Sequence, residues 1–184
     1  LPPIITKKNW DMMNKIRIQR YHSPCGDLML GSFEDKLCLC DWATEKHRDI
    51  VDIRLRKMLQ TGYEESSSSV IEETRRQLDE YFEGKRTTFN LPLLFAGTEF
   101  QKNVWYELLK IPYATTISYS ELAKRLNIPR AVRAVANANG ANGISIIVPC
   151  HRVIGSNHSL TGYAGGLDAK KKLLELESPI KTLF

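Results

Sequence analysis

Alternation of apolar and polar residues between tight turns, over residues 16–42, restricts the fold more than any other feature of this chain. Ile16 and Ile18 alternate with polar neighbours. Turn-forming sequences and apolar stretches then succeed one another, at 23–26, 28–30, 34–36 and 37–42. Short segments of this kind, bounded by Gly, Pro, Asp and Ser, are typical of paired strands. The sequence therefore predicts an antiparallel meander.

Two amphipathic helices are expected after the meander. The first covers about 44–60, with Ile50 and Ile53 among its apolar residues. Ser69 and Glu72 form a capping box that opens the second. The apolar face of this second helix repeats at helical spacing, at Ile71, Thr74, Leu78 and Phe82.

An extended linker follows at residues 86–95, where Pro92 cannot donate a backbone hydrogen bond. We place a domain boundary in this segment. The expected fold class is α+β, with an N-terminal antiparallel sheet-and-helix domain at 1–90. A mostly helical domain at 91–184 would contain a short strand leading to a cysteine.

Three helices are expected early in the second domain. A capping box at Thr98 and Gln101 opens the first, and a second box at Ser118 and Glu121 opens a short one. A further helix covers about 131–139. Two short helices joined by a turn of this size form a helix-turn-helix.

The second helix of that pair has an unusual outer face. Val132 and Val135 are expected to pack inward, which leaves outside Arg130, Arg133, Ala134, Asn137 and Ala138. Small residues let a helix approach a grooved partner closely. High helix propensity alone explains the alanines, but it does not explain an arginine among them. We therefore favour contact with a nucleic acid.

The charge distribution supports a polyanionic partner for the second domain. Residues 100–184 hold 11 Lys and Arg against 5 Asp and Glu, whereas residues 1–99 hold 15 against 16. The positive net charge of +5 therefore comes entirely from residues 100–184, which contain the predicted helix-turn-helix. A mild excess is common on protein surfaces, so this observation has weight only beside the helix face.

The apolar run at 144–148 is expected to be a buried strand that delivers Cys150 to the edge of a core. Cys150 is followed by two candidate cations, His151 and Arg152, and cationic neighbours turn a thiol into a nucleophilic thiolate. Adjacent residues point apart, so a water would bridge Cys150 and His151. Glu177 is the best acidic residue to orient His151. The alternative is that Cys150 is a buried small hydrophobe.

Composition is that of a soluble globular protein, with 42% hydrophobic and 26% charged residues. No apolar run approaches the ~18 residues of a membrane span, and no signal peptide is evident. The unevenly spaced cysteines do not suggest disulfides, so a reducing, cytoplasmic location is expected. A zinc site from His22, Cys25, Cys38 and Cys40 matches no standard spacing, and we expect Cys38 and Cys40 to pack on one face of a strand.

Several spaced motifs resemble the O6-alkylguanine-DNA alkyltransferases. Pro-Cys-His-Arg-Val at 149–153 is similar to the active-site signature of that family. Further matching elements occur in the family's order, at 100–105, 118–119, 122–123, 131–135, Asn142 and 162–167. The resemblance is dense over about 86–177. It implies a ribonuclease-H-like first domain and a winged-helix-like DNA-binding second domain.

The resemblance also implies an activity. Members of this family transfer an alkyl group from guanine O6, and in some cases O4 of thymine, to their own cysteine, once and without a cofactor. Cys150 would be the acceptor, and His151 would form the thiolate through a water. Glu177 would hold the other ring nitrogen, and Asn142 would bind the water and local backbone. Arg152 would hold the two halves of the chain together.

Roles on DNA follow from the same resemblance. Tyr119 would push the 3′ phosphate to flip the nucleotide, and Arg133 would fill the vacated stack. The outer face of the helix, with Ala134, Asn137 and Ala138, would lie in the minor groove of double-stranded DNA containing O6-alkylguanine. The implied pocket for the alkylated base consists of Pro149, Val153, Tyr163 and Ala164.

One residue of the implied base pocket differs from the family pattern. Ala164 stands where some relatives have serine, so a contact made by that hydroxyl would be lost. A monomer in the cytoplasm is expected, with access to the nucleoid or, in a eukaryote, the nucleus.

Three other functions are compatible with parts of the sequence. A non-catalytic relative that binds alkylated DNA would lack the cysteine. A helix-turn-helix regulator would leave His151, Asn142, Tyr119 and Glu177 unexplained. A cysteine hydrolase would need an oxyanion site, and none is evident.

Overall fold

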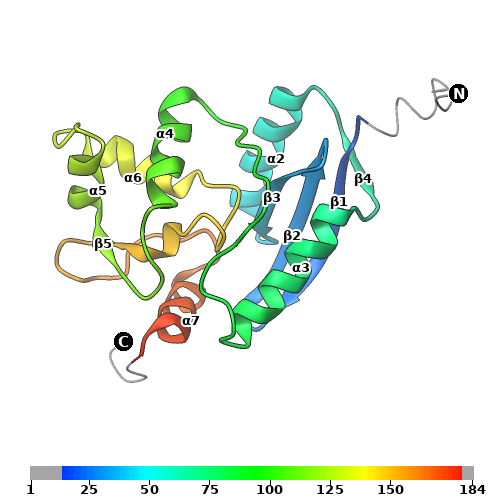
Figure 1. Cartoon of the computed structure of the whole chain (residues 1–184). Coiled ribbons are helices and arrows are strands. Elements are labelled where there is room, and N and C mark those ends of the chain that lie inside the picture. Colours follow the sequence, from blue (N-terminus) through cyan, green and yellow to red (C-terminus); the bar gives the residue numbers. More distant parts are fainter. Residues whose placement is uncertain (1–13, 180–184) are drawn as a thin grey trace, which may run out of the picture.

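The computed structural model describes residues 14–179, which form two halves joined by an extended segment (Figure 1). The N-terminal half, residues 14–95, holds a four-stranded sheet and two helices. The C-terminal half, residues 96–179, holds four α-helices and a two-stranded sheet. The predicted α+β fold class is confirmed. Over this described part of the chain, every helix is too short or too polar to span a membrane.

The N-terminal sheet has the strand order β3–β2–β1–β4. Strands β1 (Ile16–Ser23), β2 (Gly26–Phe33) and β3 (Lys36–Trp42) are antiparallel neighbours, which confirms the predicted meander. Strand β4 (Tyr63–Glu65) adds a short edge strand that is parallel to β1.

A β-bulge in β3 overturns one expectation about the cysteines. Gly31 pairs with Leu39 and Ser32 with Leu37, so Cys38 lies opposite no residue of β2. An extra residue breaks the strict alternation of side chains across a sheet. Cys38 and Cys40 therefore lie in different hydrophobic clusters and not on one shared face.

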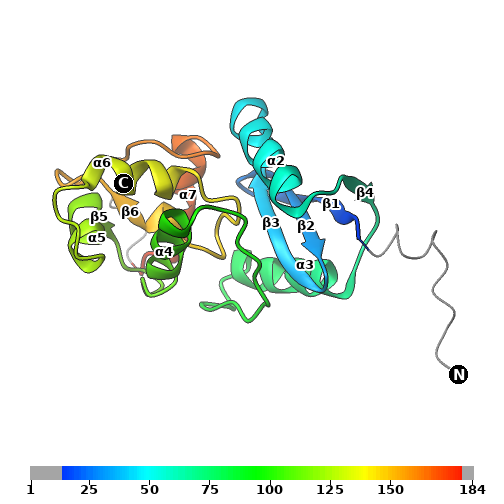
Figure 2. The same cartoon turned by 90° about the horizontal axis from the view of Figure 1, so that it is seen from above.

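The two helices of this half cover opposite faces of the sheet (Figure 2). Helix α3 (Ser69–Phe82) packs on β1, β2 and β3, and its N-cap is Ser68, one residue before the predicted cap. Helix α2 (Glu45–Leu59) packs on β3 through Val51 and Leu55. Ile50 and Ile53, which are among the apolar residues of this helix, do not contribute to its buried face, because both are largely exposed, at 64% and 68%.

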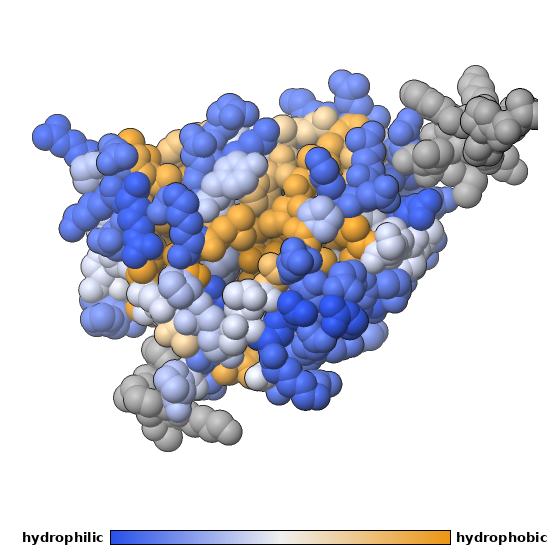
Figure 3. All heavy atoms as spheres, in the orientation of Figure 1, coloured by the Kyte–Doolittle hydropathy of each residue, from blue (hydrophilic) through white to orange (hydrophobic). Residues whose placement is uncertain are grey.

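The linker after α3 runs as an extended segment beside the edge of β3. Leu37 exchanges backbone hydrogen bonds with it, donating to Pro92 and accepting from Leu94. Figure 3 shows apolar side chains gathered between the hydrophilic surfaces of the two halves. A groove at this junction is lined from both sides, by residues that include Phe89, Leu91, Leu93, Leu109 and Ile111.

The C-terminal half contains the predicted helix-turn-helix. Helix α4 (Glu99–Leu108) begins with the predicted capping box of Thr98 and Gln101, and α5 (Tyr119–Arg125) is capped by Ser118. Helix α6 (Val132–Gly140) packs on α4 and α5. Strands β5 (Ile117–Ser118) and β6 (Val153–Ile154) pair in parallel, and α7 (Leu167–Glu177) closes the half.

The segment before Cys150 is buried as predicted, but it is a tight turn and not a strand. Ser145 bridges Val148 within the segment, while Ile144 bridges Cys40 at the edge of β3. Ile146 has φ +72°, a conformation that is strained for a β-branched residue. The short strand of this region, β6, follows the cysteine instead of preceding it. Contacts from the N-terminal half, which local sequence does not reveal, fold the apolar run back on itself.

Candidate active site

Cys150 begins a 3-10 turn, Cys150–Arg152, and only 5% of its surface is exposed. The side-chain amide of Asn142 donates to its Sγ at 3.2 Å. Burial raises the pKa of the thiol to about 11, even though the Asn142 amide and the Lys170 ammonium lower it. The resting thiol is therefore protonated, and a base has to remove its proton before sulfur can attack.

Asn142 ties this thiol to the surrounding backbone. Its Nδ2 donates to the carbonyl of Val148 at 2.9 Å, and its Oδ1 accepts from the amide of Ile144 at 2.9 Å. Asn142 lies just past the end of α6, where its backbone N–H donates to the carbonyl of Asn139. One buried residue thus connects the end of α6, the turn before the cysteine and the sulfur.

His151 is fully buried, and its two ring nitrogens have different environments. Nε2 lies 2.8 Å from Oε1 of Glu177, a carboxylate oxygen that can only accept, so this nitrogen carries a proton. Nδ1 is buried and has no hydrogen-bond partner among the described residues. Burial lowers the pKa of His151 despite the opposing effect of Glu177, so the ring is neutral and Nδ1 is a basic lone pair.

The carboxylate of Glu177, at the end of α7, accepts hydrogen bonds from three residues. Besides His151, it accepts from Nε and Nη2 of Arg152, both at 2.9 Å, and from the hydroxyl of Tyr81 at 2.7 Å. Burial alone would raise the pKa of Glu177, but the hydrogen bonds from His151 and Arg152 lower it to about 2. The carboxylate is thus charged at neutral pH and fixes the orientation of the histidine.

The expectation that Arg152 joins the two halves is wrong in detail. Its remaining hydrogen bond goes to the carbonyl of Ile111 at 2.7 Å, and its guanidinium lies over the ring of Tyr113. Like Glu177, both of these partners belong to the C-terminal half. At this carboxylate, the contact that crosses between the halves is made by Tyr81 of α3, whose hydroxyl donates to Glu177.

Lys170, in the first half of α7, is a fully buried charged residue. Its Nζ donates to the carbonyl of Val153 at 2.7 Å and to that of Thr161 at 3.0 Å. Burial lowers its pKa to about 8, while the nearby Cys150 raises it. Helical spacing could have revealed it, because Lys170 lies seven residues before Glu177 and shares its helix face.

The residues predicted to face DNA are placed mostly as expected. Arg133, Ala134 and Asn137 lie exposed on α6. Ala138 does not, because it is 3% exposed in the core and its carbonyl accepts from the indole of Trp105. The helix therefore presents a narrower outer face than predicted. Tyr119 is half-buried, and its hydroxyl donates to the carbonyl of Thr161 at 3.3 Å.

The predicted base pocket is only partly assembled around the cysteine. Val153 is buried beside the 3-10 turn, and the hydroxyl of Tyr163 is buried close to the side chains of Trp42 and Ser145. Pro149 instead lines the groove at the junction of the halves, whose lining does not include Cys150. The assignment of Pro149 to the base pocket comes from the family resemblance and stays a prediction.

The N-terminal half supports the loop that carries Tyr163 and Ala164. Trp42 at the end of β3 meets the Tyr163 ring edge-on at 5.8 Å, and Thr44 donates to the carbonyl of Ala164 at 3.1 Å. A Cβ at Gly165 would lie 2.6 Å from the Trp42 ring. Only glycine at this position lets the loop pack so closely on β3.

Within residues 14–179, no three His, Cys, Asp or Glu side chains group closely enough to hold a metal ion. His22, from the set considered for zinc, pairs with Asp27 at 2.7 Å. The described cysteines are all free thiols.

Two family models match consecutive parts of the chain. The model of the ribonuclease-like domain of 6-O-methylguanine DNA methyltransferase matches residues 16–95. The model of the DNA binding domain of 6-O-methylguanine DNA methyltransferase matches residues 99–179.

Curated relatives are similar over most of their length. The methylated-DNA–protein-cysteine methyltransferase of Methanosarcina barkeri is 45% identical over 84% of this chain and 92% of the relative. The constitutive methylated-DNA–protein-cysteine methyltransferase of Bacillus subtilis is 42% identical over 84% of this chain and 91% of the relative.

Solved structures are similar in fold as well. The O6-methylguanine methyltransferase of Mycobacterium tuberculosis aligns with a TM-score of 0.72 at 39% identity, over 89% of this chain and 92% of that one. The OGT protein of the same organism in complex with DNA aligns with a TM-score of 0.75 at 38% identity, over 90% of this chain and 96% of that one.

Proposed function

The chain belongs to the family of 6-O-methylguanine DNA methyltransferases and repairs DNA by direct alkyl transfer, and we propose that the acceptor is the thiol of Cys150. The substrate is double-stranded DNA that contains O6-alkylguanine. The transfer occurs once per protein molecule, because the product is a thioether on the protein itself. The observation that supports this acceptor best is the contact set of Cys150, a buried thiol held by Asn142 beside the His151–Glu177 pair.

The proposed reaction is a single displacement at the alkyl carbon. The thiol of Cys150 loses its proton to Nδ1 of His151 through a water, and the thiolate forms a bond to the carbon as the bond from that carbon to guanine O6 breaks. The bonding electrons stay on the base, which takes up a proton to become guanine. The alkyl group remains on sulfur, and no cofactor takes part.

The environment of the thiol supports this order of events. A pKa of about 11 keeps Cys150 protonated and unreactive when no substrate is bound. The negative charge of Glu177 stabilises the imidazolium that forms when His151 accepts the proton. The amide of Asn142 and the ammonium of Lys170 stabilise the thiolate. The groups that stabilise the thiolate and the imidazolium are therefore in place before the proton is transferred.

On DNA, we propose that the outer face of α6 enters the minor groove, with Ala134 and Asn137 closest to the base edges. Readout in the minor groove is degenerate, which suits a protein that has to find damage in any sequence. Flipping the nucleotide costs a few kcal/mol and least for a poorly paired base. Arg133 would fill the vacated stack, and Tyr119 would direct the 3′ phosphate. The protein would act as a monomer.

We further propose that the boundary between the two domains lies near residue 90. The flipped base would enter the second domain beside Val153, Tyr163 and Ala164. The hydroxyl of Thr44 holds this loop by donating to the carbonyl of Ala164, and the backbone N–H of Ala164 would donate to the base. Acceptance of O4-alkylthymine by the same pocket is part of this proposal.

Mass spectrometry after mixing with a duplex that contains O6-methylguanine tests the function. We expect one methyl group on the Cys150 peptide, formed with one equivalent of repaired DNA and no turnover. DNA binding without an adduct would indicate a non-catalytic binding protein or a helix-turn-helix regulator. Repeated turnover would indicate a hydrolase, and an adduct on another residue would disprove the acceptor.

A further inference from the structure

The end of α6 is held by hydrogen bonds from the other half of the molecule. His47 of α2 places Nε2 2.8 Å from the carbonyl of Gly140, the last residue of α6. Arg54, two turns further along α2, donates from Nη2 to the carbonyl of Ala141 at 2.7 Å. The carbonyls at a helix C-terminus lack partners within the helix and carry partial negative charge, so they attract cationic donors.

The contacts of His47 require a charged ring. Its Nδ1 lies 3.1 Å from the carboxylate of Asp41, which is fully buried, and its Nε2 faces the carbonyl of Gly140. Both partners are acceptors, whereas a neutral imidazole has only one N–H. Both hydrogen bonds form only when His47 is an imidazolium. Burial alone would lower its pKa, but Asp41 and Gly140 raise it, against a smaller lowering effect of Arg54.

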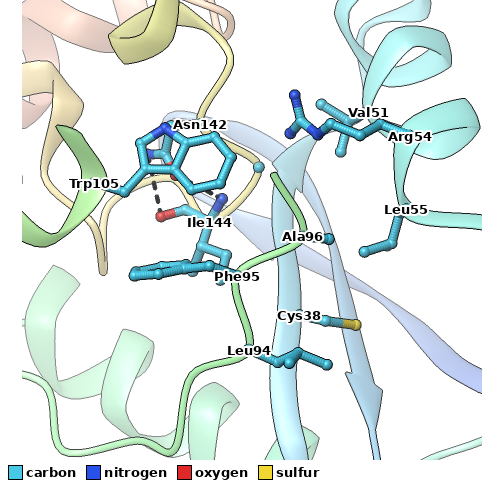
Figure 4. Close-up of a pocket in the computed structure, with 11 residues that line it drawn as sticks. Cys38, Val51, Arg54, Leu55, Leu94, Phe95, Ala96, Trp105, Asn142 and Ile144 are labelled. Atoms are coloured by element: carbon cyan, nitrogen blue, oxygen red, sulfur yellow. Dashed lines mark hydrogen bonds between the residues drawn. The ribbon is translucent and has the colours of Figure 1, made fainter. Parts of the chain in front are cut away.

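Arg54 is held in place by stacking. Its guanidinium lies over the ring of Trp105 in α4, 5.3 Å from the centroid, and Trp105 itself donates to the carbonyl of Ala138 at 2.9 Å. Figure 4 shows Arg54 and Val51 reaching from α2 toward the side of β3 on which Trp105 and Asn142 lie. Three carbonyls at the end of α6 therefore have donors from α2 or α4.

The same interface continues to the residue that holds the thiol. Asn142 follows the clamped carbonyls directly, and the carbonyl oxygen of the next residue, Gly143, accepts a hydrogen bond from the backbone N–H of Cys40 at 2.9 Å. A Cβ at Gly143 would lie 3.0 Å from Val51 of α2, so α2 and the segment pack with no spare room. The position of Asn142 beside Cys150 thus depends on contacts from the N-terminal half.

We propose that α2 is a positioning element for alkyl transfer, in which His47 and Arg54 hold the end of α6 so that Arg133 is presented to DNA while Asn142 is presented to Cys150. This inference rests on the proposed function, because it assigns α6 to DNA and Cys150 to the alkyl group. His47 and Arg54 touch neither substrate nor sulfur. They act through α6 and Asn142.

A polar clamp fits this role better than an apolar contact would. A buried charged pair such as His47 and Asp41 adds little net stability compared with well-packed apolar residues, but its hydrogen bonds fix one arrangement. Displacement of reacting groups by about 1 Å can slow an enzyme by about 10²-fold. Loss of the clamp should therefore affect reaction with DNA more than it affects folding.

Three α2 variants and one control on the same helix test the clamp. Arg54→Met keeps an aliphatic stem over Trp105 but loses the donor, Arg54→Lys keeps a donor and the charge, and His47→Gln can satisfy only one of the two acceptors. Lys57→Ala removes a positive charge from the exposed side of α2 and controls for general attraction to DNA. Two readouts apply to each protein: the single-turnover rate of methyl transfer from duplex DNA, and the pH midpoint of Cys150 labelling by iodoacetamide.

We expect Arg54→Met and His47→Gln to slow transfer about tenfold to a hundredfold, with Arg54→Lys recovering part of the loss. Both should move the labelling midpoint upward, because the amide of Asn142 no longer stabilises the thiolate. Rates and midpoints equal to those of Lys57→Ala, with only the melting temperature lowered, would overturn the clamp. Absence of methyl transfer in the unmodified protein would instead overturn the proposed acceptor. If Arg54→Met fails to fold, His47→Gln decides, since a transfer rate and a labelling midpoint equal to those of Lys57→Ala would contradict the clamp.

Discussion

The end of β3 and the 3-10 turn each bury a cysteine, and the two thiols differ in what surrounds them. Cys40 in β3 is fully buried, and both burial and the neighbouring Asp41 raise its pKa far above the usual range. Cys150 is almost as buried, but Asn142 and Lys170 offset part of the effect. Burial by itself makes a thiol inert, so the donors around Cys150 distinguish a reacting thiol from a packing residue.

The two regions are also physically connected. The backbone of Cys40 donates to Gly143 and accepts from Ser145 at 2.7 Å, which holds the turn before Cys150 against the edge of β3. The inert cysteine thus supports the proposed acceptor through its backbone, while its side chain fills the core. Changes of side chain at the two positions should have very different consequences.

Exchange of sulfur for oxygen gives the largest expected contrast. Cys150→Ser should abolish methyl transfer, because a hydroxyl at this position is a far weaker nucleophile, and DNA binding should persist. Cys40→Ser should still transfer methyl. Mass spectrometry of both variants after reaction with methylated duplex measures the contrast, and an adduct formed by Cys150→Ser would disprove the assignment.

Loss of the carboxylate at the end of α7 should affect both stability and reaction. Glu177→Gln leaves Arg152 buried without its counter-ion, and breaking a buried pair in this way costs about 3–5 kcal/mol. Urea unfolding measures this loss, and single-turnover kinetics should show slower transfer because His151 is no longer held. Glu175→Gln, in the same helix but in a more exposed pair with Lys171, is the matched control and should change neither quantity much.

Removal of the amide donor should make Cys150 resemble Cys40. Asn142→Ala should raise the pH midpoint of iodoacetamide labelling at Cys150 above about 11, the value that the intact site sustains. Asn103→Ala, at an exposed position of α4, provides the control. A midpoint that does not move would mean that the hydrogen bond to Sγ contributes nothing to the thiolate.

Alkaline pH should destabilise the fold through both thiols. Burial raises the pKa of Cys150 from the ordinary 9.0 to about 11, so the folded protein binds this proton more tightly than the unfolded chain. The resulting stability is present below pH 9 and is lost as the pH rises toward 11. Cys40 adds to the same loss, so the free energy of unfolding of Cys40→Ala should fall less steeply over this range than that of the unmodified protein.

The smallest expected effect is that of Cys40→Ala near neutral pH. Removing one buried sulfur should cost on the order of 1 kcal/mol, in the lower range of core truncations, and the rate of methyl transfer should stay within about twofold. Thermal unfolding and single-turnover kinetics check both values. A large loss of rate without a loss of stability would assign the Cys40 side chain a part in the reaction that its surroundings do not suggest.

Local features of the chain were predictable from sequence because local physics determines them. The meander follows from alternation and turns, and the starts of α4 and α5 follow from Thr98 and Ser118, whose hydroxyls accept backbone N–H groups within the same turn. Cys150, His151, Asn142 and Glu177 were identified largely through a resemblance, and the structure brings them together.

Features that depend on distant parts of the chain were not predictable. The turn at 144–148 is held against the sheet by the backbone of Cys40, and the buried face of α2 is determined by its packing on β3. Ala138 is buried because Trp105 of α4 packs there, and Lys170 is buried because a loop closes over it. Each case needed knowledge of a partner more than ten residues away or in another element.

The strained backbone of Ile146 has a consequence for when the protein becomes reactive. A left-handed conformation at a β-branched residue is not favoured locally, so the turn that leads to Cys150 persists only while the surrounding contacts hold it. Those contacts include hydrogen bonds to β3, which is formed by residues far earlier in the chain. An incompletely folded copy therefore contains the cysteine but lacks the arrangement that activates it. Each molecule therefore becomes usable for repair only when both halves have docked.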